Sequence, residues 1–365
     1  MDISKLDVNF LKNTEGLDGK DVYSVLEKPF ELYGISYDYE NKCFVRMPYD
    51  LAKSVSKPLE VLNTCTTGGR VRFSTDSKKI VIAVKYRYLV KVPHMASSGF
   101  AGFTLMEDFK NGKTVWVKTF MPPVKDNEEG YVDAVDFEKS ESVPRNGKYG
   151  MRNFTLHFPL YNDYIIDVFI GVEKGSKVEK GLPYRDIKPI LYYGSSVTQG
   201  GCANRADNLY QGFISKWSNT DYINLGYSGN GKAEPEVSKY LASIDCSVFV
   251  YDYDHNSGTA EYLEKTHYPL YKEFRASHPD VPVIFMSSHD YYKNIPNRTA
   301  RRKIIEENYK RAKAEGDDHV YYISGKKIMG DAVEDATVDG THPNDLGFYK
   351  MAKAIYKIIK PYILK

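Results

Sequence analysis

The sequence predicts two domains of different class, an all-β sandwich or jelly roll followed by a five-stranded, parallel, doubly wound α/β sheet. The chain has 365 residues, more than a single hydrophobic core usually serves. Short strand-like stretches fill its first half, and apolar strands alternate with longer helical segments in its second half. A charged segment without periodicity separates these two patterns, as expected of a domain boundary.

The first half consists of short alternating or apolar stretches that turn residues interrupt. Examples are YGISYDY, RVRFSTD, KIVIAVKYRYL, TVWVKTFM and YIIDVFIGV. Asn111 and Gly112 lie between two such stretches and predict a hairpin. Many short strands at this spacing are typical of a sandwich or jelly roll. We therefore expect an N-terminal β-sandwich domain over residues 1–175.

Residues 176–188 are expected to form a linker, because this segment is charged and contains Gly and Pro without a period. Residues 189–365 are expected to form the second domain. Its apolar runs PILYYG, YINLGY, SVFVYDY, VPVIFMS and HVYYIS are predicted to be buried parallel strands. The expected core-facing residues of three intervening helices are Leu209, Phe213 and Trp217; Val237, Tyr240, Leu241 and Ile244; and Leu346, Tyr349, Ala352, Ile355 and Ile359.

Composition and charge argue against several classes of partner. Apolar residues make up 42% of the chain, charged residues 27%, and the formal net charge is +2, so no bulk preference for nucleic acid is expected. The first residues, MDISKLDVNFLKN, carry scattered charges, and no stretch is apolar enough to span a bilayer. We therefore expect a cytoplasmic protein without a membrane partner, although removal of a leader would leave the same sequence. The four cysteines, Cys43, Cys65, Cys202 and Cys246, lack CxxC spacing, which favours free thiols.

Four polar or glycine-rich segments follow predicted strands. They are Gly194–Gly201, Asn224–Gly231, Tyr251–Asn256 and Asp339–Asp345. Because ligands bind beyond the carboxyl ends of parallel strands, these segments are candidates for a site. Ser196 lies just after the strand LYYG, on a turn that exposes its hydroxyl and directs its N–H toward a substrate oxygen. By itself, this motif also fits a Gly/Ser turn that caps a helix.

The last of these segments offers a histidine and a carboxylate. Asp339 and His342 lie three residues apart, and Pro343 disfavours helical geometry at the histidine. Asn344 fits the N-cap of the terminal helix. Such a carboxylate can hold the imidazole in one tautomer while its other nitrogen accepts a proton from serine. By itself, this spacing also fits an ordinary surface loop.

The other two segments offer donors for an oxyanion. Gly229 can supply a backbone N–H and Asn256 a side-chain amide, which with the Ser196 N–H would form a three-donor oxyanion hole. Asn256 alone also fits a cap or a turn. An acyl-transfer site explains all four segments together, so we predict Ser196 as the nucleophile and the Asp339/His342 pair as its activating dyad.

These segments resemble the four sequence blocks of the SGNH or GDSL-like hydrolases. The matching blocks are GSSVTQG, NLGYSG, the asparagine of YDYDHN, and DGTHPNDLG, over roughly residues 188 to 365. The resemblance implies a flavodoxin-like SGNH domain that forms an acyl-enzyme, without a cofactor or a metal ion. The implied site residues are Ser196, Asp339 and His342 for catalysis, with Ser196, Gly229 and Asn256 for the oxyanion hole.

This sequence departs from the family pattern at two places. Ser195 stands where the family usually has Asp, and residues 254–257 read Asp-His-Asn-Ser where the family usually has Gly-x-Asn-Asp. Both changes concern loop geometry and substrate range, because the catalytic side chains are kept. The first half resembles the β-sandwich that precedes this domain in two-domain bacterial esterases, and the GxDLY signature of that sandwich corresponds to residues 102–106.

Several relatives with this arrangement remove acetyl groups from plant polysaccharides. The resemblance therefore implies a carbohydrate acetylesterase, acting on short-chain esters such as O-acetyl groups of xylan- or mannan-derived oligosaccharides, with a small-molecule or oligosaccharide ester as its partner. One alternative is a metal-dependent deacetylase built on Asp252, Asp254 and His255 with the Asp339/His342 loop. Another is a non-catalytic carbohydrate-binding protein that kept the fold. The sequence leaves the acyl length, the alcohol and the oligomeric state open, a homo-oligomer included.

Four further residues lie near the predicted site in sequence. His289 and Asp290 follow the strand VPVIFMSS, and Arg205 and Tyr210 follow the nucleophile loop. A structural role is expected for them before a role in the acyl or sugar pocket. The basic segment RTARRKIIEENYKRAK is expected to be a solvated amphipathic helix.

Overall fold

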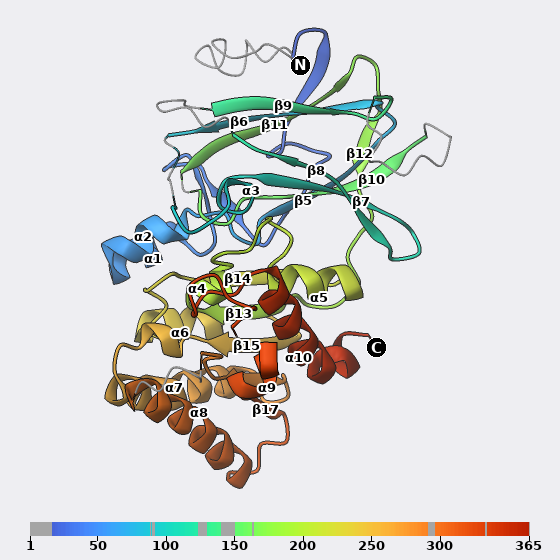
Figure 1. Cartoon of the computed structure of the whole chain (residues 1–365). Coiled ribbons are helices and arrows are strands. Elements are labelled where there is room, and N and C mark those ends of the chain that lie inside the picture. The colour runs from blue at the N-terminus through green and yellow to red at the C-terminus, as the bar shows by residue number, and fades with distance from the viewer. Residues whose placement is uncertain are drawn as a thin grey trace. The chain divides into compact units, whose positions relative to one another are not determined.

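The computed structural model describes residues 17–364 except 88, 90, 91, 123–129, 140–149, 163, 291–295 and 333. Contacts within the chain define two compact units, drawn in Figure 1. The first, called the β unit, comprises Met1–Arg46, Thr64–Tyr184 and Arg205–Asp207. The second, called the α/β unit, comprises Met47–Asn63, Arg185–Asn204 and Asn208–Lys365. The expected division at residues 175 and 188 stays a prediction, and Met47–Asn63 is an early segment that groups with the later part of the chain.

The β unit contains two antiparallel sheets and a short strand pair (Figure 1). The first sheet has the order β1 (Lys20–Ser24), β11 (Ile165–Glu173), β6 (Lys79–Tyr86), β9 (Gly130–Asp136). The second has the order β12 (Val178–Lys180), β5 (Arg70–Thr75), β10 (Arg152–His157), β7 (Phe103–Asp108), β8 (Thr114–Phe120), with β2 (Leu32–Tyr33) also paired to β5. The pair β3 (Ser36–Asp38) and β4 (Cys43–Val45) and the short helix α3 (Ser97–Phe100) complete the unit.

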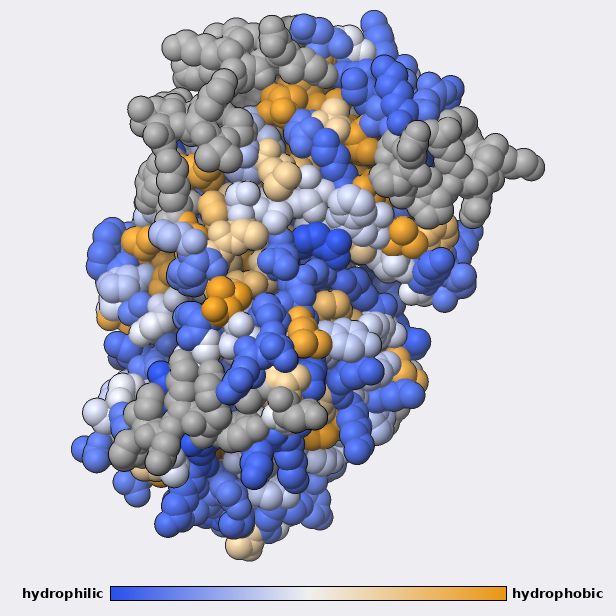
Figure 2. Space-filling view, in the orientation of Figure 1, coloured by the Kyte–Doolittle hydropathy of each residue, from blue (hydrophilic) through white to orange (hydrophobic). Residues whose placement is uncertain are grey.

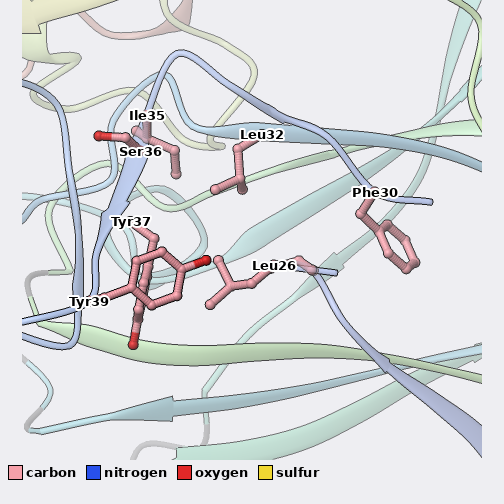
Figure 3. A pocket seen from close by; sticks show the side chains of 8 residues that line it. Leu26, Phe30, Leu32, Ile35, Ser36, Tyr37 and Tyr39 are labelled. Atoms are coloured by element: carbon pink, nitrogen blue, oxygen red, sulfur yellow. The ribbon is translucent and has the colours of Figure 1, made fainter. Parts of the chain in front are cut away.

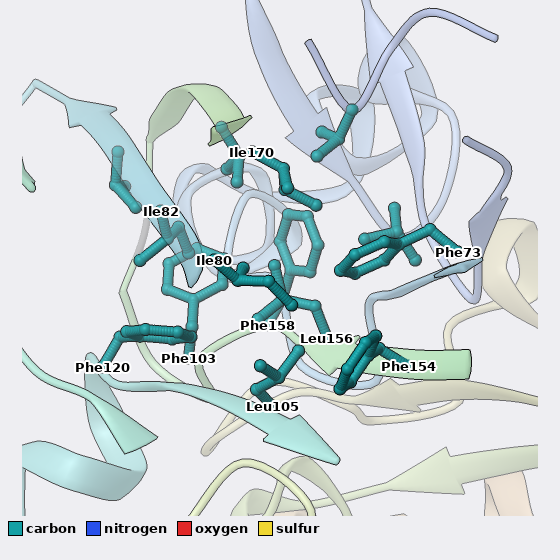
Figure 4. Packing of buried hydrophobic residues seen from close by; sticks show 14 of the residues in the cluster. Phe73, Ile80, Ile82, Phe103, Leu105, Phe120, Phe154, Leu156, Phe158 and Ile170 are labelled. Carbon is teal, nitrogen blue, oxygen red and sulfur yellow. The ribbon is translucent and has the colours of Figure 1, made fainter. Parts of the chain in front are cut away.

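Both sheets contribute to one apolar core (Figure 4). Its members include Phe73, Phe103, Leu105, Phe154 and Leu156 from the second sheet and Ile80, Ile82 and Ile170 from the first. The middle of strand β6, from Ile80 to Val84, is apolar because both of its faces are covered: Ile80 and Ile82 join this core, whereas Val81 and Ala83 join a separate cluster with Phe169. The predicted all-β first domain is therefore confirmed as a sandwich.

The hairpin predicted at Asn111 and Gly112 is also confirmed, between β7 and β8. The Phe109 N–H donates to the Lys113 carbonyl at 2.8 Å and closes the turn. Gly112 has a φ of +82°, a left-handed conformation that favours glycine at this position.

A pocket of about 280 Å³ opens in the β unit (Figure 3). Its lining residues are Val25, Leu26, Phe30, Leu32, Ile35, Ser36, Tyr37 and Tyr39. The rings of Tyr37 and Tyr39 meet edge to face, with 5.0 Å between their centroids. Apolar side chains form most of the wall, so the pocket offers few directed polar contacts.

The α/β unit is built on one parallel sheet of five strands. The strands are β13 (Ile190–Gly194), β14 (Tyr222–Gly226), β15 (Val248–Asp252), β16 (Val283–Met286) and β17 (Val320–Ile323), in the spatial order β14-β13-β15-β16-β17. Every pair is parallel. This is the flavodoxin-like order, in which the chain reverses its direction of winding between β13 and β15. The predicted doubly wound fold is confirmed.

Helices cover both faces of this sheet (Figure 1). They are α1 (Tyr49–Val55), α2 (Lys57–Asn63), α4 (Ser196–Gln199), α5 (Tyr210–Ser218), α6 (Pro235–Ala242), α7 (Ala260–Ser277), α8 (Pro296–Ala314), α9 (Gly325–Met329) and α10 (Asp345–Ile363), with the 3-10 turns η3 (Asp254–Asn256) and η4 (Gly330–Ala332). Helices α1, α2, α6, α7 and α8 share a core cluster with Leu191, Phe249 and Phe285 of the sheet. On the other face, Tyr192 of β13 meets Tyr210 of α5, and Tyr210 meets Phe348 of α10.

Two of the three predicted core-facing stripes need correction. Trp217 is 36% exposed, and Leu346 and Tyr349 are 45% and 38% exposed. The buried faces of α5 and α10 instead include Tyr210, Ile214, Phe348 and Met351. Trp217 and Tyr349 pack edge to face at the surface, with ring centroids 5.6 Å apart. The prediction from helical spacing therefore assigned these two surface aromatic residues to the core wrongly.

Helix α8 is amphipathic as expected, but not all of its arginines are solvated. Ile305 and Ala312 are buried, and Lys310 pairs with Glu306 at 2.7 Å on the outer face. In the region of α7 and α8, Figure 2 shows a mostly hydrophilic surface. Arg301, however, is only 4% exposed, because its guanidinium turns inward to the carbonyl of Asp254.

The four cysteines all lie in the described part of the chain, where they are buried and form no disulfide. Across the same described residues, none of the helices has the length and apolar character that crossing a bilayer requires.

Candidate active site

The predicted site residues lie at the carboxyl edge of the parallel sheet. Ser196 follows β13, and Asn256 ends the turn η3 after β15; these are the two strands that flank the reversal in winding. Gly229 lies in the loop after β14, and the loop with Asp339 and His342 precedes α10. Ligands of flavodoxin-like sheets bind at this edge.

Ser196 is the first residue of α4, on a turn that hydrogen bonds hold firmly. The Ser195 side chain caps this helix and accepts a backbone N–H of its first turn at 3.2 Å. The Thr198 carbonyl accepts from the side chains of Asn224 and Gln211 at 2.7 and 2.9 Å. Ser196 itself is 9% exposed. The turn is therefore fixed by buried polar groups, while the nucleophile candidate keeps access to solvent.

Two glycines allow this turn to lie against the strand ends. A Cβ on Gly194 would lie 2.2 Å from the Asp252 carbonyl oxygen, and one on Gly226 would lie 2.2 Å from the Gln199 nitrogen. Neither contact is possible without a shift of the backbone. A side chain at either position would therefore displace the turn that carries Ser196.

The structure brings the serine, the histidine and the aspartate into one hydrogen-bonded chain. Ser196 Oγ lies 2.9 Å from His342 Nε2, and His342 Nδ1 lies 2.7 Å from Asp339 Oδ2. Asp339 Oδ1 also accepts from the backbone N–H groups of Thr341 and His342, at 2.9 and 2.8 Å. This is the arrangement of nucleophile, base and orienting carboxylate found in serine hydrolases.

The protonation state of Asp339 suits this arrangement. Partial burial works against its ionisation, but hydrogen bonds from the His342 backbone and side chain and from the Thr341 N–H lower the pKa of Asp339 well below its ordinary value. The ionised carboxylate accepts the Nδ1–H of His342, so the lone pair of Nε2 faces Ser196. In this tautomer the imidazole can accept the serine proton.

The predicted oxyanion donors differ in their surroundings. Gly229 has a φ of +68° with open space where a Cβ would lie, and in the described part of the chain its N–H has no hydrogen-bond partner. Asn256 Nδ2 donates to the carbonyls of Tyr227 and Gly231, at 2.9 and 3.1 Å. Asn256 thus braces the turn that carries Gly229, and its direct donation to an oxyanion stays a prediction.

The alternative metal site is not supported by the side chains that would form it. Among the described residues, Asp252, Asp254 and His255 do not bring three ligand atoms within 4.8 Å of one another. Asp254 Oδ2 instead accepts the Ser288 N–H at 3.0 Å. Burial, and secondarily the neighbouring Asp254, raises the pKa of Asp252 well above its ordinary value, which favours the protonated form that binds cations poorly.

The four further candidates have clear partners. The buried His289 donates from Nε2 to the Thr341 carbonyl at 2.6 Å, so it contacts the loop that carries the candidate catalytic pair. Asp290 pairs with arginines of α8. Tyr210 is fully buried and donates to a threonine of the nucleophile turn at 3.3 Å, and Arg205 pairs with a neighbouring aspartate at 3.2 Å. The structural role expected of Asp290, Tyr210 and Arg205 agrees with these partners and stays a prediction, whereas His289 is linked to the loop of Asp339 and His342.

Two family models match the sequence, one for each half. Residues 187–360 match the GDSL-like lipase/acylhydrolase family, and residues 22–178 match the N-terminus of SGNH-hydrolase-type esterases, the GxDLY family. The chain therefore carries a GxDLY domain followed by a GDSL-like, SGNH-type hydrolase domain. These two matches confirm the resemblance that the sequence indicates.

Solved structures share the fold of this GDSL-like chain over nearly its whole length. One is a protein described as a GDSL-like lipase from Bacteroides ovatus, with a TM-score of 0.80, 25% identity, and coverage of 94% of this chain and 98% of that chain. The salicylyl-acyltransferase SsfX3 of a tetracycline biosynthetic pathway has a TM-score of 0.74 at 16% identity and the same two coverages. The acetyl xylan esterase Est2A of Butyrivibrio proteoclasticus has a TM-score of 0.56 at 11% identity, again covering 94% and 98%. The sequence has no match among curated proteins.

Two features of the GDSL-like site were missed in the sequence. The first is the contact of His289 with Thr341, for which the sequence offers only a histidine at a strand end. Because the acceptor is a backbone carbonyl, the identity of residue 341 gives no indication of this hydrogen bond. The second is the pair of hydrogen bonds from the Asn256 amide to backbone carbonyls. The sequence does not indicate whether an asparagine amide makes such bonds or points toward a ligand.

Three buried histidines should make this GDSL-like unit sensitive to acid. Burial lowers the pKa of His255, His267 and His289 to about 3, so the folded protein keeps them neutral, whereas the unfolded chain binds protons below about 6.5. Stability is therefore lost as the pH falls from about 6.5 toward 3, and at pH 5 each histidine lowers the free energy of unfolding by about 2 kcal/mol. We expect the melting temperature, followed by circular dichroism, to fall steeply between pH 7 and pH 5.

A His267→Gln variant provides the control for this prediction. It removes one of the three groups that take up protons on unfolding, so its melting temperature should depend less on pH than that of the wild type. An equal melting temperature at pH 7 and pH 5 in the wild type would contradict the prediction.

Proposed function

We propose that this chain is a serine esterase that hydrolyses short acyl esters through an acyl-enzyme. The observation that carries the proposal is the 2.9 Å contact between Ser196 Oγ and His342 Nε2, two groups that lie 146 residues apart in sequence. Asp339 orients the imidazole from its other side at 2.7 Å. A hydroxyl so placed becomes a nucleophile when an ester carbonyl approaches.

In the proposed reaction, Ser196 Oγ attacks the ester carbonyl while His342 Nε2 takes the hydroxyl proton. The backbone N–H groups of Ser196 and Gly229 stabilise the oxyanion, with the Asn256 amide as the predicted third donor. Collapse of the tetrahedral intermediate breaks the bond to the alcohol, which leaves with the proton from His342. Water then attacks the acyl-enzyme with the same base, and the acid is released.

The substrate class that we propose is an O-acetylated carbohydrate, such as an oligosaccharide derived from xylan or mannan. The neighbours in fold include the acetyl xylan esterase Est2A and a family-two carbohydrate esterase from Cellvibrio japonicus, the latter with a TM-score of 0.54 at 12% identity. This likeness concerns the fold, and it makes acetylated carbohydrates the first substrates to test.

The test is a substrate panel with the full chain. Acetate release is measured from acetylated xylan, acetylated mannan and their short oligomers, beside aryl esters of increasing acyl length, with and without a chelator. We expect acetate release from the oligosaccharides, the highest kcat/KM for the shortest aryl esters, and no effect of the chelator.

Each competing function has its own outcome in this panel. Loss of hydrolysis with the chelator would favour the metal-dependent deacetylase, and glycan binding in calorimetry without acetate release would favour a non-catalytic binding protein. Acetylation of an added alcohol in place of acetate release would indicate an acyltransferase, the activity that SsfX3 carries in its name.

A further inference from the structure

The peptide group that precedes the candidate base is held at both ends. The Thr341 carbonyl accepts a hydrogen bond from His289 Nε2 at 2.6 Å, and the His342 N–H donates to Asp339 Oδ1 at 2.8 Å. A peptide plane that is fixed at its oxygen and at its nitrogen cannot rotate without breaking one of these bonds. The direction in which the His342 side chain leaves the backbone is therefore set by two separate partners.

These two partners come from different parts of the fold. The bonds to Asp339, and the bond from the Val338 N–H to the His342 carbonyl at 2.9 Å, join residues of the loop to one another. His289 instead follows strand β16 and lies 52 residues before Thr341 in sequence. It ties the loop to the parallel sheet, the same sheet whose strand β13 leads into the turn of Ser196.

His289 is suited to donate this one hydrogen bond. Its side chain is 2% exposed, and burial, followed by the nearby His255, lowers the pKa of His289 to about 3. The neutral imidazole has a single N–H, and the bond to Thr341 requires that this hydrogen sit on Nε2. The neighbouring ring of His255, with its centroid 5.7 Å away, is also neutral, so neither histidine places a positive charge beside His342.

We propose that His289 is a positioning residue for the reaction of Ser196: by holding the Thr341 carbonyl, it sets the distance and angle between His342 Nε2 and Ser196 Oγ. This role rests on the proposed function. Without this bond, the loop could shift relative to the sheet while keeping its internal bonds. A displacement of about 1 Å in such a site can lower the rate about 100-fold.

The test uses two substitutions of nearly equal size. Glutamine in His289→Gln keeps an N–H donor at about the distance of Nε2, whereas methionine in His289→Met fills similar space without a donor. The measurement is the second-order rate of Ser196 labelling by a fluorophosphonate between pH 5 and pH 9, because this probe needs no knowledge of the natural ester. We expect His289→Met to react about 10- to 100-fold more slowly with an altered pH profile, and His289→Gln to stay within a few-fold of the wild type.

A buried histidine elsewhere in the unit controls for general destabilisation. His267→Met removes an equally buried imidazole, which bonds Asn308 and not the loop, so it should lower the melting temperature and leave the labelling rate unchanged. If His289→Met does not fold, His289→Asn replaces it, because the shorter amide cannot reach Thr341.

The outcomes separate this role from the proposed function. Labelling of His289→Met and His289→Asn at the wild-type rate across the pH range would overturn the positioning role alone, as would an equal loss of rate in His267→Met. A wild-type chain that neither reacts with the probe nor hydrolyses any ester would overturn the proposed function, and the role of His289 with it.

Discussion

Replacing Ser196 with alanine is expected to lower ester hydrolysis by about 10⁴- to 10⁶-fold, as removal of the nucleophile does in serine hydrolases. The remaining rate reflects only substrate binding and the backbone donors. The folded structure should be little affected, because the turn is held by the Ser195 cap and by the bonds to the Thr198 carbonyl, none of which uses the Ser196 hydroxyl. Initial rates on an aryl acetate and thermal melts of both proteins measure the two effects.

The adjacent serine offers a matched control. Ser195→Ala removes the helix cap, which costs about 1 kcal/mol of stability, but leaves the hydroxyl at 196 beside His342. Its activity should fall far less than that of Ser196→Ala, because the loosened turn still carries the nucleophile, while its melting temperature falls slightly. Retention of more than a few per cent of the rate in Ser196→Ala, or a comparable loss in Ser195→Ala, would argue against Ser196 as the nucleophile.

Replacing Asp339 with asparagine is expected to lower kcat by about 10⁴-fold while the loop keeps its shape. The amide oxygen can still accept the N–H groups of Thr341 and His342, which Asp339 Oδ1 accepts in the wild type. The amide nitrogen, however, takes the place of Oδ2 and donates to His342 Nδ1. The imidazole hydrogen is then forced onto Nε2, where it faces the serine hydroxyl and blocks proton transfer.

An exposed aspartate in the same loop serves as the control for this substitution. Asp335→Asn makes the same chemical change without touching His342, and it should leave kcat and KM unaltered. Steady-state kinetics on one aryl ester compare the two variants with the wild type. An Asp339→Asn variant with more than about a tenth of the wild-type kcat would show that the carboxylate does not orient the base.

The sequence predicted those features that local chemistry decides. Parallel strands that are buried on both faces have continuous apolar sequences, which the sequence shows directly. The polar turns at the carboxyl ends of such strands lie at one edge of the sheet. The position of Ser196 at that edge follows from this topology. The loop of Asp339 and His342 comes after helix α9 and the turn η4, and the structure places its atoms within hydrogen-bond distance of Ser196. The GDSL-like family model matches this same part of the chain, residues 187–360.

Features that depend on distant packing were not predictable in this way. Leu346 and Tyr349 follow helical spacing, yet they are exposed, because the neighbours of α10 cover only one side of that helix. Arg301 lies in a basic run, yet it is buried, because it finds a carbonyl oxygen inside the unit. The link from His289 to Thr341 depends on a main-chain atom that every residue type shares. In each case the burial or the bonding of the residue depends on its partner in the fold and not on its own type.

The segment Met47–Asn63 affects the order in which the chain can fold. It belongs to the α/β unit, where Ala52 and Leu59 join the core and the Tyr227 hydroxyl donates to Asn63 at 3.3 Å. During synthesis these two helices leave the ribosome before any strand of the sheet that they will cover. The apolar sides of these two helices therefore stay unpacked until most of the protein has been made. Their contact with the sheet joins distant parts of the sequence, and such contacts slow folding.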